Sequence, residues 1–280
     1  MNPKNAGLWR SGRSIKSKHS RLAKALTDIY DGLNRWELWG TLGWHDIRHR
    51  YRRSIIGPFW ITLSMGTMVG ALGFLYTQFF GQPIRDYLPF LSLGIIIWGF
   101  ISTLILDGCV VFIASESVIR QLRAPLSIHV FRATWRNLII FAHNMVIYLI
   151  IMLIFGIWPG TRALLAIPGM LILCLNGIWA SFLVGLLSAR FRDIPMLAAN
   201  IIQILFFFTP IIWNVEQLRS SRLVAELNPF YHLVEIVRMP LLGHSPPLST
   251  WLVVLGVTAV GYLVALGFFV RFRARIAYWV

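Results

Sequence analysis

Residues 88–113 have the sequence LPFLSLGIIIWGFISTLILDGCVVFI, a run of 26 residues in which Asp107 is the one charged side chain. A helix needs about 20 apolar residues to cross the hydrocarbon core of a bilayer, so this run is long enough to span a membrane. Five more apolar runs lie at residues 59–80, 137–157, 163–187, 196–213 and 251–270. They are too long for strands and lack the alternation of a β-barrel, so they predict helices.

The composition agrees with this assignment. Of the 280 residues, 57% are hydrophobic and only 13% are charged, whereas soluble domains contain about half apolar and a quarter charged residues. We therefore predict an all-α integral membrane protein with six transmembrane helices. The net charge of +15 does not indicate nucleic acid, because all four lysines lie in the first 24 residues and the arginines flank apolar runs. That distribution is typical of topology signals and of contacts to anionic membrane lipids.

The basic residues also predict the orientation. Five of the 26 lysines and arginines fall in the segments that would lie outside, namely Arg85, Arg162, Arg219, Arg222 and Arg238. The other 21 fall in the opposite set of segments. Because loops on the cytoplasmic side carry the excess of Lys and Arg, we expect both termini in the cytoplasm.

The chain is expected to divide into three parts. Residues 1–21 form a flexible basic tail, residues 22–58 an amphipathic interfacial helix with a basic approach to the first span, and residues 59–280 the transmembrane domain. The amphipathic helix is predicted from apolar residues that recur at spacings of four and three, namely Leu22, Leu26, Ile29, Leu33 and Trp36. Such a helix lies flat in the membrane interface. Packing on a partner protein is the alternative.

The segment at residues 214–250 is predicted to form short external re-entrant helices. Asn228 followed by Pro229 is typical of a helix N-cap with proline at the first helical position. Apolar residues then repeat with helical spacing from Phe230 until Pro240 ends the pattern.

Motifs of catalysis and of nucleotide binding are missing from the sequence. There is no G-x-x-x-x-G-K-[ST], so this chain is not expected to hold nucleotide phosphates in a P-loop. His45-Asp46-Ile47-Arg48-His49 resembles a zinc motif, but Asp is shorter than Glu and the adjacent arginines would repel a dication. We predict no catalytic residues, no metal and no cofactor on this chain. A membrane-embedded glycosyltransferase or acyltransferase is the enzyme alternative, and a secondary transporter is the third option.

Polar residues within the apolar runs are the candidate functional residues, because each is costly in lipid. Asp107 lies near the cytoplasmic half of the second run, where we expect a partner such as Arg120 or Arg190. Asn200, Gln203 and Phe207 share one face of the fifth run. These side chains line either a conduit or a subunit interface, or they form ordinary interhelical hydrogen bonds. Aromatic residues such as Tyr76 and Phe80 stack on sugar rings in the first case and belong to an interfacial belt in the second.

Five sequence motifs, in order, resemble one known family. The sequence resembles the permease subunits of ABC exporters for O-antigen and related polysaccharides, within the ABC-2 type, from about residue 36 to the end of the chain. The motifs are Arg50-Tyr51-Arg52-Arg53-Ser54 with Gly57-Pro58-x-Trp60, Arg190-Phe191-Arg192-Asp193-Ile194, Thr209-Pro210-Ile211-Ile212-Trp213, Asn228-Pro229-Phe230 through Arg238-x-Pro240-Leu241-Leu242-Gly243, and Arg275-Ile276-Ala277-Tyr278-Trp279.

The resemblance implies a homodimer in the bacterial inner membrane. Two copies of a cytoplasmic ATP-binding subunit would carry ATP and Mg²⁺, and a polyprenyl-pyrophosphate-linked polysaccharide would pass between the protomers during lipopolysaccharide biosynthesis. Capsule and teichoic acid are alternative substrates. The implied ATPase-coupling residues are Glu116, Arg120, Arg123, Arg190, Arg192 and Asp193, the channel-lining candidates are Tyr76, Phe80, Asp107, Asn200, Gln203 and Phe207, and the external gate consists of Asn228, Pro229, Phe230 and Arg238.

Overall fold

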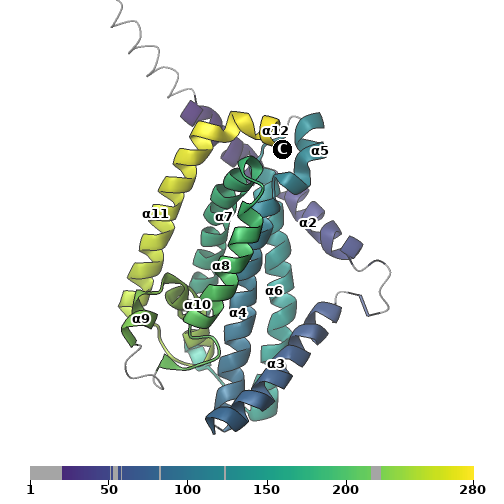
Figure 1. Cartoon of the computed structure of the whole chain (residues 1–280). Helices are drawn as coiled ribbons and strands as arrows, with labels where there is room; N and C mark the ends of the chain where they lie inside the picture. The colour runs from purple at the N-terminus through teal and green to yellow at the C-terminus, as the bar shows by residue number, and fades with distance from the viewer. Residues whose placement is uncertain are drawn as a thin grey trace, which may run out of the picture.

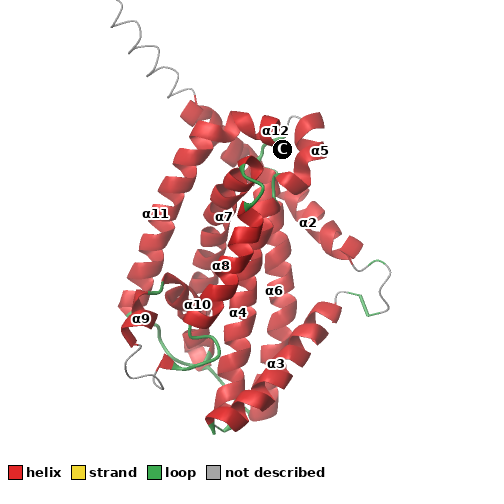
Figure 2. Cartoon of the chain, in the orientation of Figure 1, coloured by secondary structure: helices red, strands yellow, loops and turns green. Residues whose placement is uncertain are grey.

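The computed structural model describes residues 21–50, 52, 56–57, 59–81, 83–122, 124–215 and 222–280, and the side chains of these except at positions 50, 80 and 222–224. Every regular element in these ranges is a helix (Figure 2). The prediction of an all-α fold is confirmed for this part of the chain.

The helices follow one another in a simple order. A helix at residues 21–34 comes first. It is followed by α2 (Trp36–Arg50), α3 (Phe59–Phe80), α4 (Ile84–Val110), α5 (Glu116–Gln121), α6 (Ser127–Phe155), α7 (Ala166–Arg190), α8 (Ile194–Phe208), α9 (Arg222–Leu227), α10 (Pro229–Leu241), α11 (Leu248–Phe272) and α12 (Ile276–Trp279). Short 3-10 turns lie at Ile113–Ser115, Gly160–Leu165 and Arg273–Arg275.

Five of these elements are long and apolar enough to cross a membrane among the residues described. They are α3, α4, α6, α7 with the turn before it, and α11 with the helical turns after it. The chain is therefore a multi-pass membrane protein. The expected fifth run contains the 15-residue helix α8, which at 1.5 Å per residue is about 22 Å long. A bilayer core is about 30 Å thick, so α8 alone does not confirm a sixth span.

Two helices begin or end at other residues than the expected apolar runs, for physical reasons. The helix in the fifth run ends at Phe208 instead of continuing to residue 213, because the residue before a proline disfavours helical geometry and Thr209, before Pro210, is extended. Pro210 therefore ends the helix. Helix α6 begins at Ser127, ten residues before the expected third run. Arg132 and Arg136 made this segment look like a loop, but both are paired within the fold.

The helices pack side by side into a bundle with two different ends (Figure 1). One end carries the helix at residues 21–34, α5 and α12, and we call it the basic end. The opposite end carries α9 and α10. Because α8 runs back alongside α7 and α11 then returns, the last residue lies at the same end as the first described helix.

Helix α4 lies at the centre of the bundle. In its most apolar 18-residue stretch 67% of the residues are buried, against 11% for α3. Its close contact with α7 depends on small residues: a Cβ atom at Gly108 would lie 2.8 Å from the Cα of Ser181. Gly177, Ser181 and Gly185 recur at every fourth position of α7. This small-xxx-small pattern lets two membrane helices approach closely.

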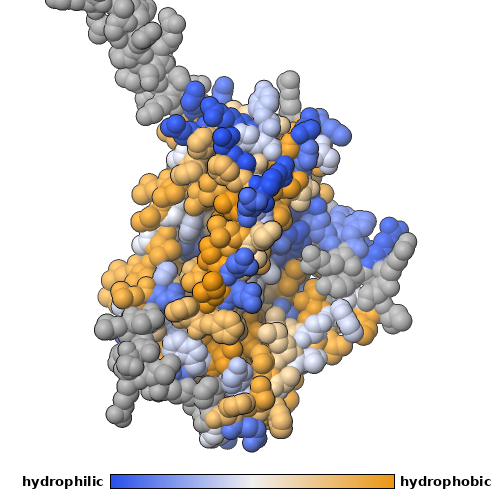
Figure 3. Space-filling view, viewed as in Figure 1, coloured by the Kyte–Doolittle hydropathy of each residue, from blue (hydrophilic) through white to orange (hydrophobic). Residues whose placement is uncertain are grey.

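The outer surface of the bundle is largely apolar. Figure 3 shows hydrophobic residues over α11, α8 and α3, and hydrophilic residues at the basic end and around α2. On α3, large side chains such as Phe59, Phe74 and Phe79 are well exposed. Such a surface needs lipid or another protein chain to cover it.

Candidate functional site

At the basic end, α5 contacts the last residue of the chain. Glu116 and Arg120 form an ion pair of 3.0 Å, four residues apart on α5. Arg120 also donates from Nε and from Nη2 to the main-chain oxygen of Val280, over 3.2 Å for Nε. Both side chains of the ion pair are about half exposed, so the pair itself contributes little to stability. Its effect is to orient Arg120 toward residue 280.

The corner between α7 and α8 contacts the same C-terminal segment. The Arg190 guanidinium lies 5.3 Å from the ring of Trp279, and Arg192 Nη2 donates to the carbonyl oxygen of Trp279 over 3.2 Å. Asp193 is exposed and stands at the start of α8 without a side-chain cap hydrogen bond. Residues 276–280 therefore join both loops that the resemblance assigns to coupling. Arg123 lies outside the described residues.

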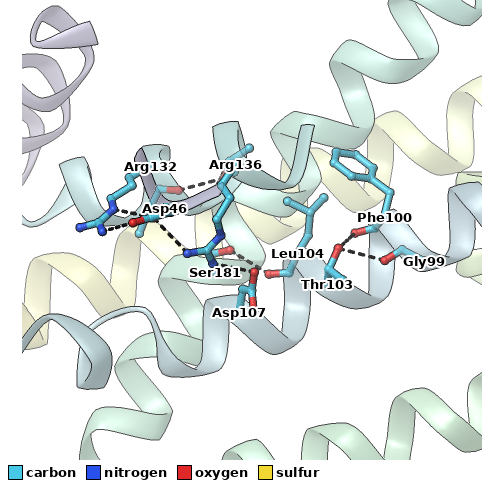
Figure 4. Close-up of polar contacts among 11 residues, drawn as sticks. Asp46, Gly99, Phe100, Thr103, Leu104, Asp107, Arg132, Arg136 and Ser181 are labelled. Atoms are coloured by element: carbon cyan, nitrogen blue, oxygen red, sulfur yellow. Dashed lines mark hydrogen bonds and ion pairs between the residues drawn. The ribbon is translucent and has the colours of Figure 1, made fainter. Parts of the chain in front are cut away.

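A network of four charges links α2, α6 and α4 (Figure 4). Arg132 binds both carboxylate oxygens of Asp46, with 2.8 Å between Nε and Oδ2. Arg136 bridges two acids: Nη1 lies 3.2 Å from Asp46 and Nη2 lies 2.7 Å from Asp107. Asp107 has an arginine partner, as expected. The partner is Arg136, however, and not Arg120 or Arg190.

The network keeps the Asp46 carboxylate charged. Burial alone would raise the pKa of Asp46, but hydrogen bonds and charge from Arg132, followed by the charge and hydrogen bond of Arg136, outweigh it and hold that pKa below its ordinary value. The His45 and His49 rings lie 6.4 Å apart. Asp46, the acid between these two histidines in the zinc-like motif, is bound by the guanidinium groups of Arg132 and Arg136.

Helix α8 is largely apolar but carries exposed polar side chains. Asn200, Gln203 and Phe207 are all exposed, and only Ile202 of α8 is fully buried. On the packed side, the Phe206 ring lies 6.1 Å from that of Trp98 in α4. The predicted shared face of Asn200, Gln203 and Phe207 is thus exposed on the surface of the protomer.

Two aromatic candidates lie on α3. Tyr76 is partly buried, with its ring 6.4 Å from that of Phe79. The side chain of Phe80 lies outside the described residues.

At the opposite end, Asn228 caps α10 as predicted. Its Oδ1 accepts from Phe230 N over 2.9 Å and its Nδ2 donates to Thr209 Oγ1 over 3.0 Å, while Pro229 occupies the first helical position. The Phe230 ring packs at 5.8 Å against Trp98. The cap therefore ties α10 to the end of α8 and to α4.

Arg238, the fourth gate candidate, is almost fully buried. It pairs with Glu235 one turn earlier on α10, and its guanidinium lies 4.0 Å over the Phe90 ring of α4. A Cβ at Gly94 would lie 3.1 Å from Arg238 Nη1, so the glycine makes room for this side chain. Two buried charges are costly unless paired, which makes Glu235 a necessary partner.

Several of these residues were missed from the sequence. Arg132 and Arg136 were counted as topology charges, and Asp46 was considered only as the acid of a zinc-like motif, because their partners lie on other helices. The pairing of Glu235 with Arg238 could have been inferred from the sequence, because Glu235 lies three residues before Arg238 on a largely apolar helix.

The comparison with known families matches this architecture. A family model described as "ABC-2 type transporter" matches residues 37–242, from the start of α2 to the end of α10. The match covers well over half of the 280 residues. The chain belongs to the ABC-2 type transporter family. ABC-2 permeases are the membrane-spanning transport subunits of ABC transporters, which implies an ATP-binding partner.

One relative of this ABC-2 permease is the O-antigen export system permease protein RfbA of Myxococcus xanthus. The two are 23% identical over 218 residues, which cover 77% of this chain and 84% of the relative. The ABC-2 match leaves out the helix at residues 21–34 and all of α11 and α12.

Proposed function

We propose that this ABC-2 permease is the channel-forming subunit of an ATP-driven exporter. Its substrate is a lipid-linked polysaccharide of the O-antigen kind, and it works in the bacterial inner membrane. The name of the Myxococcus xanthus relative supports this substrate class. The basic end faces the cytoplasm, because the Lys and Arg residues concentrate there.

The observation that carries the proposal is the uncovered polar face of α8. Asn200 and Gln203 are exposed at the side of an apolar bundle, where contact with hydrocarbon would leave their amides without hydrogen bonds. A second protomer facing α8 gives them a water-filled or sugar-filled surrounding. The homodimer is part of the same proposal, and the lightly packed α3, which needs lipid or another chain to cover it, supports it.

The chemistry of the face suits a sliding glycan. Amide side chains exchange hydrogen bonds with hydroxyl groups, and an aromatic ring such as Phe207 stacks on a sugar ring. Each contact is weak and easily replaced by the next sugar unit. A conduit needs this balance, because a deep binding site would stop transport.

Energy reaches the permease from the separate ATP-binding subunit, which carries ATP and Mg²⁺. Closure of the two ATP-binding subunits pushes on α5 and on the corner at residues 190–193. The contacts of Arg120 and Arg192 with residues 279–280 make these two loops move together. The external helix α10 opens at the other end of the passage.

A gene deletion in the native host tests the proposal. We expect the deletion strain to lose surface polysaccharide and to accumulate the lipid-linked polymer on the cytoplasmic side, with both effects reversed by the wild-type gene. The sugars of the accumulated polymer distinguish O-antigen from capsule and teichoic acid. Normal surface polysaccharide in the deletion strain, or ATP hydrolysis by the purified chain alone, would overturn the proposal.

A further inference from the structure

The most deeply buried acid at the basic end belongs to the helix at residues 21–34. The Asp28 side chain is 0% exposed, and it shares a buried face with Ala25 and Gly32. Leu26 and Leu33 are about half exposed and line an apolar groove that the helix forms with α7 and α11. The helix therefore docks on the bundle through its small and acidic face, with its apolar residues beside that groove.

The Asp28 carboxylate caps another helix. Oδ1 accepts from Ser127 N over 3.0 Å and Oδ2 accepts from Leu126 N over 3.1 Å. These are the first N–H groups of α6, where Leu126 occupies the N-cap position and offers no side-chain acceptor. A carboxylate at this point satisfies unpaired donors and opposes the positive end of the helix dipole.

Two further contacts hold the same group in place. Arg273, after α11, donates from Nε over 2.8 Å and pairs through Nη2 at 2.6 Å with Asp28 Oδ2. Ser127 Oγ donates back to the Asp28 carbonyl oxygen over 2.7 Å. Gly32 is required beside it, because a Cβ there would lie 2.0 Å from Ser127 Oγ.

Asp28 thus joins three segments that are far apart in the sequence. Only residues 122–126 separate the capped end of α6 from the coupling helix α5. Arg273 leads directly into α12, whose neighbours Arg120 and Arg192 belong to the two coupling loops. A separate apolar cluster under these contacts includes Ala25, Ile276 and Val280. A displacement of α5 cannot leave the helix at residues 21–34 behind.

We propose that Asp28 is a positioning residue for energy coupling: it locks the interfacial helix and α11 onto the α5–α6 junction, so that the ATP-binding subunit moves these elements as one body. The inference rests on the proposed function. It extends that function to two segments outside the ABC-2 family match.

The test compares Asp28→Asn with Asp31→Asn in the permease assembled with its ATP-binding subunit. Both substitutions remove one negative charge from the same helix, but none of the contacts described above involves the Asp31 side chain. In hydrogen exchange, Asp28→Asn should speed exchange of the Leu126 and Ser127 amides roughly tenfold or more, the effect of losing a charged hydrogen-bond acceptor. Asp31→Asn should leave both amides unchanged.

The second readout is the amount of ATP hydrolysed per polysaccharide exported. Asp28→Asn should raise this ratio severalfold at unchanged complex yield, and Asp31→Asn should not. If Asp28→Asn lowers the yield, Arg273→Gln serves instead, because it keeps both backbone hydrogen bonds and should give a smaller rise. A role confined to stability would change the yield and leave the ratio alone.

The two readouts separate the ways in which the inference can fail. Unchanged amide exchange in Asp28→Asn overturns the clamp itself. If amide exchange is faster in Asp28→Asn but the ratio of ATP hydrolysed to polysaccharide exported is unchanged, and the wild-type complex exports normally, the coupling role of Asp28 is overturned. A wild-type complex that exports nothing overturns the proposed function, and the coupling role with it.

Discussion

Breaking the buried ion pair on α10 should cost more stability than any exposed substitution. Arg238→Met removes a guanidinium that is 1% exposed and leaves the Glu235 carboxylate, 10% exposed, without its partner. An uncompensated buried charge of this kind costs about 3–5 kcal/mol. Loss of the contact with Phe90, 4.0 Å from the guanidinium, adds roughly 0.5–2 kcal/mol.

The assay is unfolding by SDS in mixed micelles, followed by tryptophan fluorescence. Glu235→Gln should also destabilise, because it leaves Arg238 charged and buried. The double variant should cost less than the sum of the two single variants by roughly 2 kcal/mol, since it leaves no buried charge. Glu37→Gln on α2, an exposed position, is the control and should change little. Single-variant costs under about 1 kcal/mol, or strictly additive costs, would refute the reasoning.

Three further predictions concern other contacts. The pKa of Asp46 is lowered in the fold, so the stability that this carboxylate contributes is complete above the ordinary aspartate pKa and is lost as pH falls through the lowered value. The stability difference between wild type and Asp46→Asn should therefore stay constant from about pH 5 to 8 and shrink below about pH 4. A difference that changes at neutral pH would contradict this. Asn228→Ala should cost about 1 kcal/mol in the same unfolding assay through the lost cap, with no loss at all counting against the cap. Arg192→Ala and Asp193→Ala should uncouple ATP hydrolysis from export at normal yield, and normal export by both would argue against their coupling role.

The apolar core of the fold was predictable because length and composition decide it. The run at 88–113 predicted α4 to within a few residues of each end. The expected helix boundaries differed from the structure where residues that look like a loop in the sequence are paired with residues of other helices. Arg132 and Arg136 belong inside α6 because Asp46 and Asp107 neutralise them, and no property of residues 127–136 alone indicates that. The end of α8 before Pro210 follows a local rule instead, because the residue before a proline disfavours helical geometry.

In the candidate site, too, local features could be predicted from the sequence and contacts between distant residues could not. Asn228 was found from sequence, since a cap and its proline are adjacent in the chain. The polar face of α8 was found because its residues share one helix. The Asp28 and Asp46 contacts were not found, because each joins residues about 90 or more positions apart. Pairing at such distances depends on how helices pack, which a single sequence does not specify.

The most direct test of the central claim is the accessibility of α8 from water within the membrane. In a variant lacking Cys109 and Cys174, Gln203→Cys is labelled with a water-soluble thiol reagent in membrane vesicles. Leu263→Cys on α11, where the native side chain is 73% exposed, is the matched control. If the face of α8 lines the passage, Gln203→Cys reacts, the reaction blocks export, and Leu263→Cys stays unlabelled. Equal inertness of the two cysteines would place Gln203 against lipid and contradict the account.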